Sequence, residues 1–130
     1  PTSIAWGYEN RTTAIRIPAG SPSARRIEHR VAGGDVNPYL MLAAILGAAL
    51  DGIENEMDPP TPIVGNAYEQ TEQRTLFWRD TIDDFMASDF ITANFGEKFR
   101  HIFGQQKLKE MRSFYTEVTT LEYDWYLRAV

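Results

Sequence analysis

The sequence has no cysteine among its 130 residues, and its first 97 residues contain no lysine. Without cysteine, neither a disulfide framework nor a thiolate metal site can form, so a metal ion would need carboxylate or histidine ligands. The longest apolar run, residues 39–50, is shorter than the roughly 18 to 20 residues that cross a bilayer. No basic segment followed by an apolar one stands at the front. We therefore expect a soluble, cytoplasmic protein with no membrane partner.

Motifs of several common active sites are also absent. The chain contains no glycine-rich phosphate loop, no nucleophile elbow and no cysteine–histidine pair, so it offers no support for a self-contained hydrolase or P-loop enzyme. Its pI is near 5.0, and its arginines are not interleaved with aromatic residues. Both features argue against a nucleic-acid partner.

Arginine is locally abundant in residues 1–30, although the whole chain carries a net charge of −5. Five arginines against two glutamates give this segment +3 and leave −8 for the other hundred residues. Arginine without lysine indicates bidentate recognition of phosphate or carboxylate, because the planar guanidinium matches those oxygens and stays charged. Surface arginines that pair with acids elsewhere are the alternative.

The length and the 43% hydrophobic content predict one folding unit with a real core. The sequence starts at Pro1, without a methionine, inside a segment whose pattern is that of ordered structure. We therefore expect residues 1–130 to be a fragment of a longer protein.

The front of the chain predicts a pair of strands. Residues 12–18 alternate small or apolar with polar side chains and end at a proline, residues 19–23 have turn composition, and residues 25–31 form a second candidate strand. We expect these two strands to pair through the short turn.

The remainder of the sequence predicts helices. Asn37-Pro38 is a helix start signal, and the helix is expected to run to about residue 56. Its segment 39–50 is apolar on every side, so we expect it to be buried against something larger than the two strands. A proline-rich connector follows, and residues 75–130 show amphipathic helical periodicity, with Thr119 and Glu122 as a capping box for the last helix. The predicted fold class is α+β.

One face of the second predicted strand carries an unusual set of charges. Alternation places Arg26, Glu28 and Arg30 on one face and His29 on the other. If the charged face lines a pocket, the carboxylate could bind a hard cation such as Mg²⁺ and the guanidiniums could neutralise phosphate oxygens. A solvated Arg–Glu–Arg salt-bridge ladder is the alternative.

The other strand and its approach carry two further candidates. Arg16 lies between two isoleucines and faces away from them, and Arg11 precedes the strand, where a loop could bring it to the mouth of the same pocket. For His29 and His101 we expect structural or surface roles.

Four blocks within residues 10–53 match a known family: Asn10-Arg11-Thr12-Thr13-Ala14-Ile15-Arg16-Ile17-Pro18, Ala24-Arg25-Arg26-Ile27-Glu28-His29-Arg30, Asn37-Pro38-Tyr39-Leu40 and Ala49-Leu50-Asp51-Gly52-Ile53. In this order and spacing they closely resemble the C-terminal portion of the catalytic domain of the glutamine synthetase family. Residues 54–130 are similar to the family's helical tail, especially at Gly65-Asn66-Ala67-Tyr68 and Ser88-Asp89-Phe90.

The resemblance implies a ligase that uses ATP to activate the γ-carboxylate of glutamate as an acyl phosphate, which ammonia or an amine then attacks. It implies that Glu28 is a ligand of a divalent cation, Mg²⁺ or Mn²⁺. It also implies that Arg16 and Arg26 contact the ATP phosphates, and that Arg11 and Arg30 contact the transferred phosphoryl group and the glutamate carboxylate. The implied fold is a curved antiparallel sheet or partial barrel packed on helices, in a homo-oligomer.

The sequence departs from glutamine synthetases proper directly after the charged strand. Where these have an aliphatic or aromatic residue and then Arg-Phe-Pro-Asp-Pro, this chain has His29 and Arg30 followed by Val31-Ala32-Gly33-Gly34-Asp35. That pattern resembles the γ-glutamylpolyamine synthetase branch slightly more, so we favour a di- or polyamine acceptor over ammonia. A catalytically inactive binding or structural module that keeps the fold is the alternative function.

Overall fold

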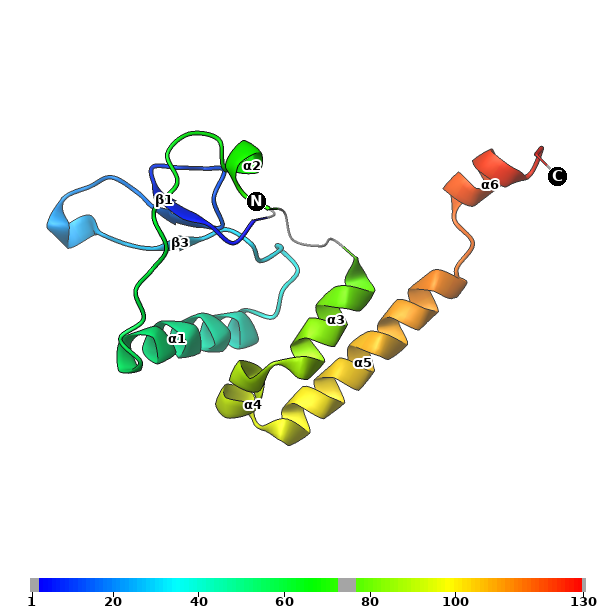
Figure 1. The fold of residues 1–130 in the computed structure, drawn as a ribbon. Helices are drawn as coiled ribbons and strands as arrows, with labels where there is room; N and C mark the ends of the chain where they lie inside the picture. The colour runs from blue at the N-terminus through cyan, green and yellow to red at the C-terminus, as the bar shows by residue number, and fades with distance from the viewer. Residues whose placement is uncertain (1–2, 73–76, 130) are drawn as a thin grey trace. The chain divides into compact units, whose positions relative to one another are not determined.

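The computed structural model describes residues 3–72 and 77–129 of the chain. Its contacts group the chain into two compact units, residues 1–76 and residues 77–130 (Figure 1). The first is a small sheet with two helices, and the second is helical. The α+β class predicted from the sequence is therefore present. Across the described ranges, no helix combines the length and the apolar character needed to span a bilayer.

The first unit is built on a three-stranded sheet in the order β1 (Trp6–Tyr8), β2 (Ile15–Ile17), β3 (Glu28–His29). β2 and β3 pair antiparallel, as the sequence predicts, and the register places Arg16 opposite Glu28. β1, which was not predicted from the sequence, pairs parallel with β2. It consists of only three residues in a segment with no clear alternation, so periodicity gives no warning of it.

The connection between β1 and β2 is unusually short. Parallel strands normally need about a dozen connecting residues or more, whereas residues 9–14 suffice here. Each strand has three residues and is therefore about 10 Å long. A connection of a few residues can run back over this distance to the start of the next parallel strand. Thr13 is fully buried in this loop, and its hydroxyl lies 2.8 Å from the Asn10 carbonyl and 2.9 Å from that of Ile15. The loop is thus compact and internally bonded.

The predicted strand 25–31 is too long. In the observed register Arg26 would lie opposite Pro18, which has no N–H for the ladder, so the pairing stops at Glu28. The chain instead forms a short 3-10 helix, η1 (Pro22–Ala24), before β3. Beyond the C-terminal end of β3 the pairing continues by one hydrogen bond, in which the Arg30 amide donates to the Ala14 carbonyl at 2.9 Å.

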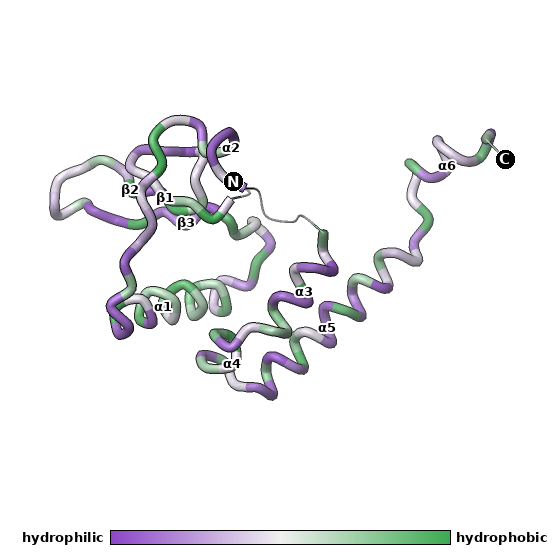
Figure 2. The backbone as a smooth tube through the Cα atoms, in the orientation of Figure 1, coloured by the Kyte–Doolittle hydropathy of each residue, from purple (hydrophilic) through white to green (hydrophobic). Residues whose placement is uncertain are grey.

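Helix α1 (Pro38–Glu54) begins as predicted. The Asn37 side chain accepts hydrogen bonds from the amides of Tyr39 and Leu40, and Pro38 occupies the first turn. The helix ends two residues before the predicted boundary. It is apolar along most of its length (Figure 2), yet it has no buried residue, and Tyr39 is 83% exposed. Within residues 3–72, much of the apolar surface of α1 is therefore left exposed.

An extended segment and the short helix α2 (Ala67–Gln70) complete the first unit. The segment lies beside β1, since the Ile63 amide donates to the Trp6 carbonyl at 2.9 Å and the Trp6 indole donates to the Pro60 carbonyl at 2.6 Å. α2 was not predicted. Asn66 begins it by accepting from the Tyr68 amide, a start signal like that of Asn37 but followed by only one turn.

The second unit consists of α3 (Trp78–Ala87), α4 (Asp89–Phe95), α5 (Glu97–Thr116) and α6 (Thr120–Tyr126). The helix predicted near residues 75–90 is in fact divided at Ser88, whose hydroxyl accepts from the Ile91 amide and starts α4. The first residues of that prediction lie outside the described residues. The capping box between Thr119 and Glu122 is confirmed.

Helices α3 and α4 pack against α5 (Figure 1). Stacked and tilted rings join the three helices, in the pairs Phe85–Phe103, Phe95–Phe99 and Phe99–Phe103. At Gly104 the approach is so close that a Cβ atom would lie 1.9 Å from Met86 Sδ. These rings, together with Ile82 and Met111, form the core of this unit, whereas Phe114 and Tyr115 near the end of α5 are exposed.

Candidate active site

The candidate site lies on the sheet of the first unit, where Arg16, Glu28 and Arg30 form a row of alternating charge. Glu28 Oε2 accepts from Arg16 Nη1 and Glu28 Oε1 accepts from Arg30 Nη1, both at 2.8 Å. The antiparallel register creates this row, because Arg16 and Glu28 are directly opposite and project from the same face. The predicted grouping on one strand face is confirmed for Glu28 and Arg30, with Arg16 joining from β2.

The row is partly withdrawn from solvent. The side chains of Arg16, Arg30 and Glu28 are 14%, 24% and 35% exposed. Burial by itself raises the pKa of the Glu28 carboxyl, but hydrogen bonds from Arg30 and Arg16 outweigh it and bring the pKa below its ordinary value. Glu28 is therefore a carboxylate at neutral pH, with each oxygen held by a different guanidinium.

Glu9 is a fourth member of the cluster and was not predicted. Its Oε2 accepts from Arg16 Nη2 at 3.1 Å, and its Oε1 accepts from the Ala19 amide. The hydrogen bond from Ala19, followed by that from Arg16, lowers the pKa of Glu9. The bond to Glu9 likewise raises the pKa of Arg16. Glu9 is the one acidic residue before Glu28, but neither composition nor periodicity indicates that its side chain reaches Arg16.

The arginines of the row have unused hydrogen-bonding capacity. The Nε atoms of Arg16 and Arg30 are buried and have no hydrogen-bond partner among the described residues. A guanidinium carries five N–H donors, and the contacts to Glu9 and Glu28 use two on Arg16 and one on Arg30. Donors in this number and charge fit the oxygens of a phosphate.

Arg11 and Arg26 lie outside the row. Arg11 is exposed, and within residues 3–72 its side chain makes no hydrogen bond or ion pair. Arg26 is also exposed and precedes β3, and its Nη1 donates to the Ala24 carbonyl at 3.3 Å. The predicted strand face that joined Arg26 to Glu28 is wrong in this respect, because β3 begins only at Glu28. The roles expected of both arginines stay predictions.

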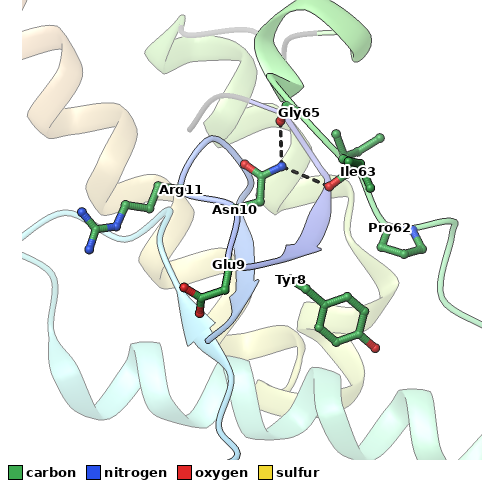
Figure 3. Close-up of a pocket in the computed structure, with 8 residues that line it drawn as sticks. Tyr8, Glu9, Asn10, Arg11, Pro62, Ile63 and Gly65 are labelled. Atoms are coloured by element: carbon green, nitrogen blue, oxygen red, sulfur yellow. Dashed lines mark hydrogen bonds between the residues drawn. The ribbon is translucent and has the colours of Figure 1, made fainter. Parts of the chain in front are cut away.

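Asn10 anchors the loop that presents Arg11 (Figure 3). Its Nδ2 donates to the carbonyls of Ile63 at 3.0 Å and Gly65 at 2.8 Å, and its Oδ1 accepts from the amide and hydroxyl of Thr12. All four bonds that an amide side chain can make are thereby formed. The Arg11 side chain extends away from these bonds. A pocket of about 290 Å³ opens here, lined by residues 8–11 and 62–65.

The described residues do not supply a complete metal site. No group of three or more histidine, cysteine, aspartate or glutamate side chains in these residues could hold a cation. Glu28 alone fits as one ligand, because a carboxylate has about four acceptor positions and the arginines occupy two of them. His29 and His101 are both exposed. A cation at Glu28 would need further oxygen ligands from outside these residues.

Comparison with known proteins gives one family. The model of the glutamine synthetase catalytic domain matches residues 1–126. The chain is 37% identical over 129 residues to the gamma-glutamylputrescine synthetase PuuA of Escherichia coli, and 36% identical over 129 residues to the gamma-glutamylethanolamide synthetase GlnA4 of Streptomyces coelicolor. Each match covers 98% of this chain and 27% of the relative.

A third relative is the glutamine synthetase of Thermotoga maritima, at 34% identity over 136 residues, with 98% of this chain and 31% of that protein covered. The chain thus spans between a quarter and a third of the length of these curated relatives.

Proposed function

Because the chain belongs to the glutamine synthetase family, we propose that it forms part of an ATP-dependent ligase that joins the γ-carboxylate of glutamate to an amine. In this proposal ATP activates the carboxylate as an acyl phosphate, and the amine displaces the phosphate. The chain contributes the arginine-rich wall of the site, and the remainder of a longer protein contributes the rest.

The observation that carries the proposal is the half-buried Glu28 carboxylate held between two guanidiniums. In a surface salt-bridge ladder the side chains are exposed, and water satisfies the donors that the ion pairs do not use. Here the row is partly buried, and the Nε atoms of Arg16 and Arg30 have no partner among residues 3–72. Both features fit a wall that receives an anionic ligand.

Each residue has a proposed role. Glu28 is one ligand of a divalent cation, Arg16 and Arg26 contact the ATP phosphates, and Arg11 and Arg30 contact the transferred phosphoryl group and the glutamate carboxylate. When bound, Mg²⁺ or Mn²⁺ neutralises phosphate charge and polarises the phosphoryl group. The arginines add fixed positive charge where negative charge is concentrated in the transition state.

The other ligands of the cation are proposed to come from parts of the protein beyond residues 1–130. The chain by itself is then inactive, because hard divalent cations need several oxygen ligands. We further propose that β1, β2 and β3 belong to a larger curved sheet or partial barrel. The whole protein is proposed to be a cytoplasmic homo-oligomer.

A di- or polyamine is the proposed acceptor, slightly favoured over ammonia. The support is the sequence after Glu28, which departs from the glutamine synthetase pattern, together with the similarity to the gamma-glutamylputrescine synthetase. The relatives also include enzymes named for ethanolamide and glutamine synthesis, which makes ethanolamine and ammonia the competing acceptors.

The test is phosphate release by the full-length protein from ATP, Mg²⁺ and glutamate, with ammonia, putrescine, ethanolamine or isopropylamine as acceptor. We expect glutamate-dependent and amine-dependent turnover, fastest with putrescine, and none from residues 1–130 alone. Absence of turnover with every acceptor would favour the inactive structural module. Full turnover by residues 1–130 alone would show that the site is complete within this chain.

A further inference from the structure

We propose that Glu9 is a positioning residue that holds the guanidinium of Arg16 in place while Glu28 serves the cation. This inference rests on the proposed function. Its basis is the placement of Arg16 between two carboxylates, Glu28 at 2.8 Å from Nη1 and Glu9 at 3.1 Å from Nη2. Two contacts through different nitrogens fix both the position and the plane of a guanidinium, which a single contact does not.

Glu9 is itself held firmly. Its backbone amide donates to the Ile17 carbonyl at 3.1 Å, and its second carboxylate oxygen accepts from the Ala19 amide. The backbone of Glu9 has φ = 52°, a left-handed conformation that is uncommon for any residue other than glycine. Residues kept in such conformations are held by their surroundings and gather at functional sites. Glu9 lies directly after β1, and its carboxylate reaches Arg16 on the neighbouring strand β2.

The chemistry of the row explains why a second carboxylate is useful. A divalent cation at Glu28 draws on the same oxygen lone pairs that Arg16 and Arg30 use, and it repels both guanidiniums. With Glu28 as its one partner, Arg16 would be loosened whenever the cation bound. Glu9 is separate from the proposed metal position and keeps Arg16 anchored, so the arginine stays directed at the ATP phosphates.

The test is Glu9→Gln in the full-length protein, with the Michaelis constants for ATP and glutamate measured separately. Glutamine can still accept from the Ala19 amide but has no charge to hold Arg16. We expect the KM for ATP to rise about tenfold, as for other residues that orient a ligand-binding group. The KM for glutamate and the melting temperature should change little, which distinguishes positioning from a general structural role.

Glu56→Gln is the matched control. Glu56 is the other residue besides glycine with positive φ in the described ranges, at 49°, and it follows α1, away from the charged cluster. The same chemical change at the same kind of backbone position should leave the KM for ATP at the wild-type value. Glu9→Asp, which keeps the charge but is one methylene shorter, serves as a second variant if Glu9→Gln folds poorly, and it should also raise the KM for ATP.

A double-mutant cycle tests whether Glu9 acts through Arg16. Once Arg16 is changed to lysine, Glu9→Gln should have little additional effect. Unchanged KM for ATP in both Glu9 variants, or fully additive effects in the cycle, would overturn the proposal. Failure of the wild-type protein to turn over is a different result, because it would contradict the ligase function and not the role of Glu9.

Discussion

Residues 3–72 and residues 77–129 are held together by different kinds of contact. In the first unit the buried apolar residues are the small side chains of Ala5, Ala14 and Ala67, and much of the order comes from Asn10 and its polar neighbours. In the second unit aromatic rings stack between helices, with Ile82 and Met111 buried among the helices. One unit depends on hydrogen bonds and charges, and the other on apolar packing.

This difference assigns the proposed catalytic residues to the first unit and much of the apolar packing to the second. Polar networks place side chains with directional precision but contribute little burial, whereas ring packing contributes burial with little chemistry. All five proposed site residues lie in the first unit. Substitutions in the first unit should therefore affect catalysis strongly, and those in the second unit should affect stability.

The largest effect is expected from Glu28→Ala in the full-length protein. Loss of a metal ligand, together with the release of two guanidiniums, should lower kcat by about 100- to 1,000-fold, the range for removing one group that stabilises transition-state charge. Phosphate release measured across a Mg²⁺ titration checks this.

His29→Ala is the control for Glu28→Ala, because His29 is the next residue of β3 but is exposed. It should remain within about threefold of wild type, as expected of an exposed side chain that makes no specific contact. Near-normal activity of Glu28→Ala with an unchanged Mg²⁺ requirement would show that Glu28 binds no cation and only forms salt bridges with the neighbouring arginines.

Arg30→Lys tests whether geometry or charge matters in the row. Lysine keeps the positive charge but replaces the planar fork with a single ammonium, so one group cannot hold Glu28 and a substrate anion in the same way. We expect a loss of about 10- to 100-fold in kcat/KM. Steady-state kinetics with ATP and glutamate varied in turn is the measurement. Wild-type kinetics would mean that only the charge of Arg30 is used.

Asn10→Ala should weaken the first unit selectively. The change removes bonds to Ile63 and Gly65 and leaves the Thr12 amide without its acceptor, at a cost of about 2 kcal/mol in local opening. Hydrogen exchange should accelerate in residues 60–67 and stay unchanged in α5.

Asn94→Ala is the matched control for Asn10→Ala, since the Asn94 side chain makes one exposed bond, to the Phe90 carbonyl. It should have a small effect confined to α4. Equal acceleration of hydrogen exchange in both units after Asn10→Ala would show that the two units are not stabilised independently.

Gly104→Ala is the corresponding test of the second unit. The added methyl would meet Met86, which can move only by disturbing the α3–α5 packing, so we expect a loss of about 1 to 2 kcal/mol in stability. Kinetic constants should be unaffected.

Gly52→Ala in α1 is the control for Gly104→Ala, because nothing lies within 4 Å of a Cβ atom there. It should stabilise the protein slightly, by up to about 1 kcal/mol, through helix propensity. A destabilised Gly52→Ala variant would show that the α1 surface is covered in the full-length protein.

The sequence predicted the features that depend on local chemistry. Asn37-Pro38 marked the start of α1, Thr119 and Glu122 marked that of α6, and the period-2 pattern brought Glu28 and Arg30 together. It missed what depends on pairing with distant segments. β1 is ordered by β2 and by the Ile63 segment, and the start of β3 is limited by Pro18, which directly follows β2.

Glu9 illustrates why part of the site could not be predicted. Its contact with Arg16 requires a parallel strand pair and a left-handed backbone at a residue that is not glycine. Neither feature has a signature in composition or periodicity, because glutamate has no preference for that conformation. The resemblance to a family pointed to the arginines but carried no role for Glu9.

The six-residue return between β1 and β2 has a consequence for the order of folding. Trp6 lies opposite Ile15, so this pairing closes a loop of only nine residues, whereas the Asn10 bond to Ile63 spans 53 residues. Closing the longer loop costs about 1.6 kcal/mol more in chain entropy. The local pair is therefore expected to nucleate first, during synthesis, as soon as residue 17 is free of the ribosome. Arg16 would then occupy its strand before the segment that later secures the Arg11 loop has been translated.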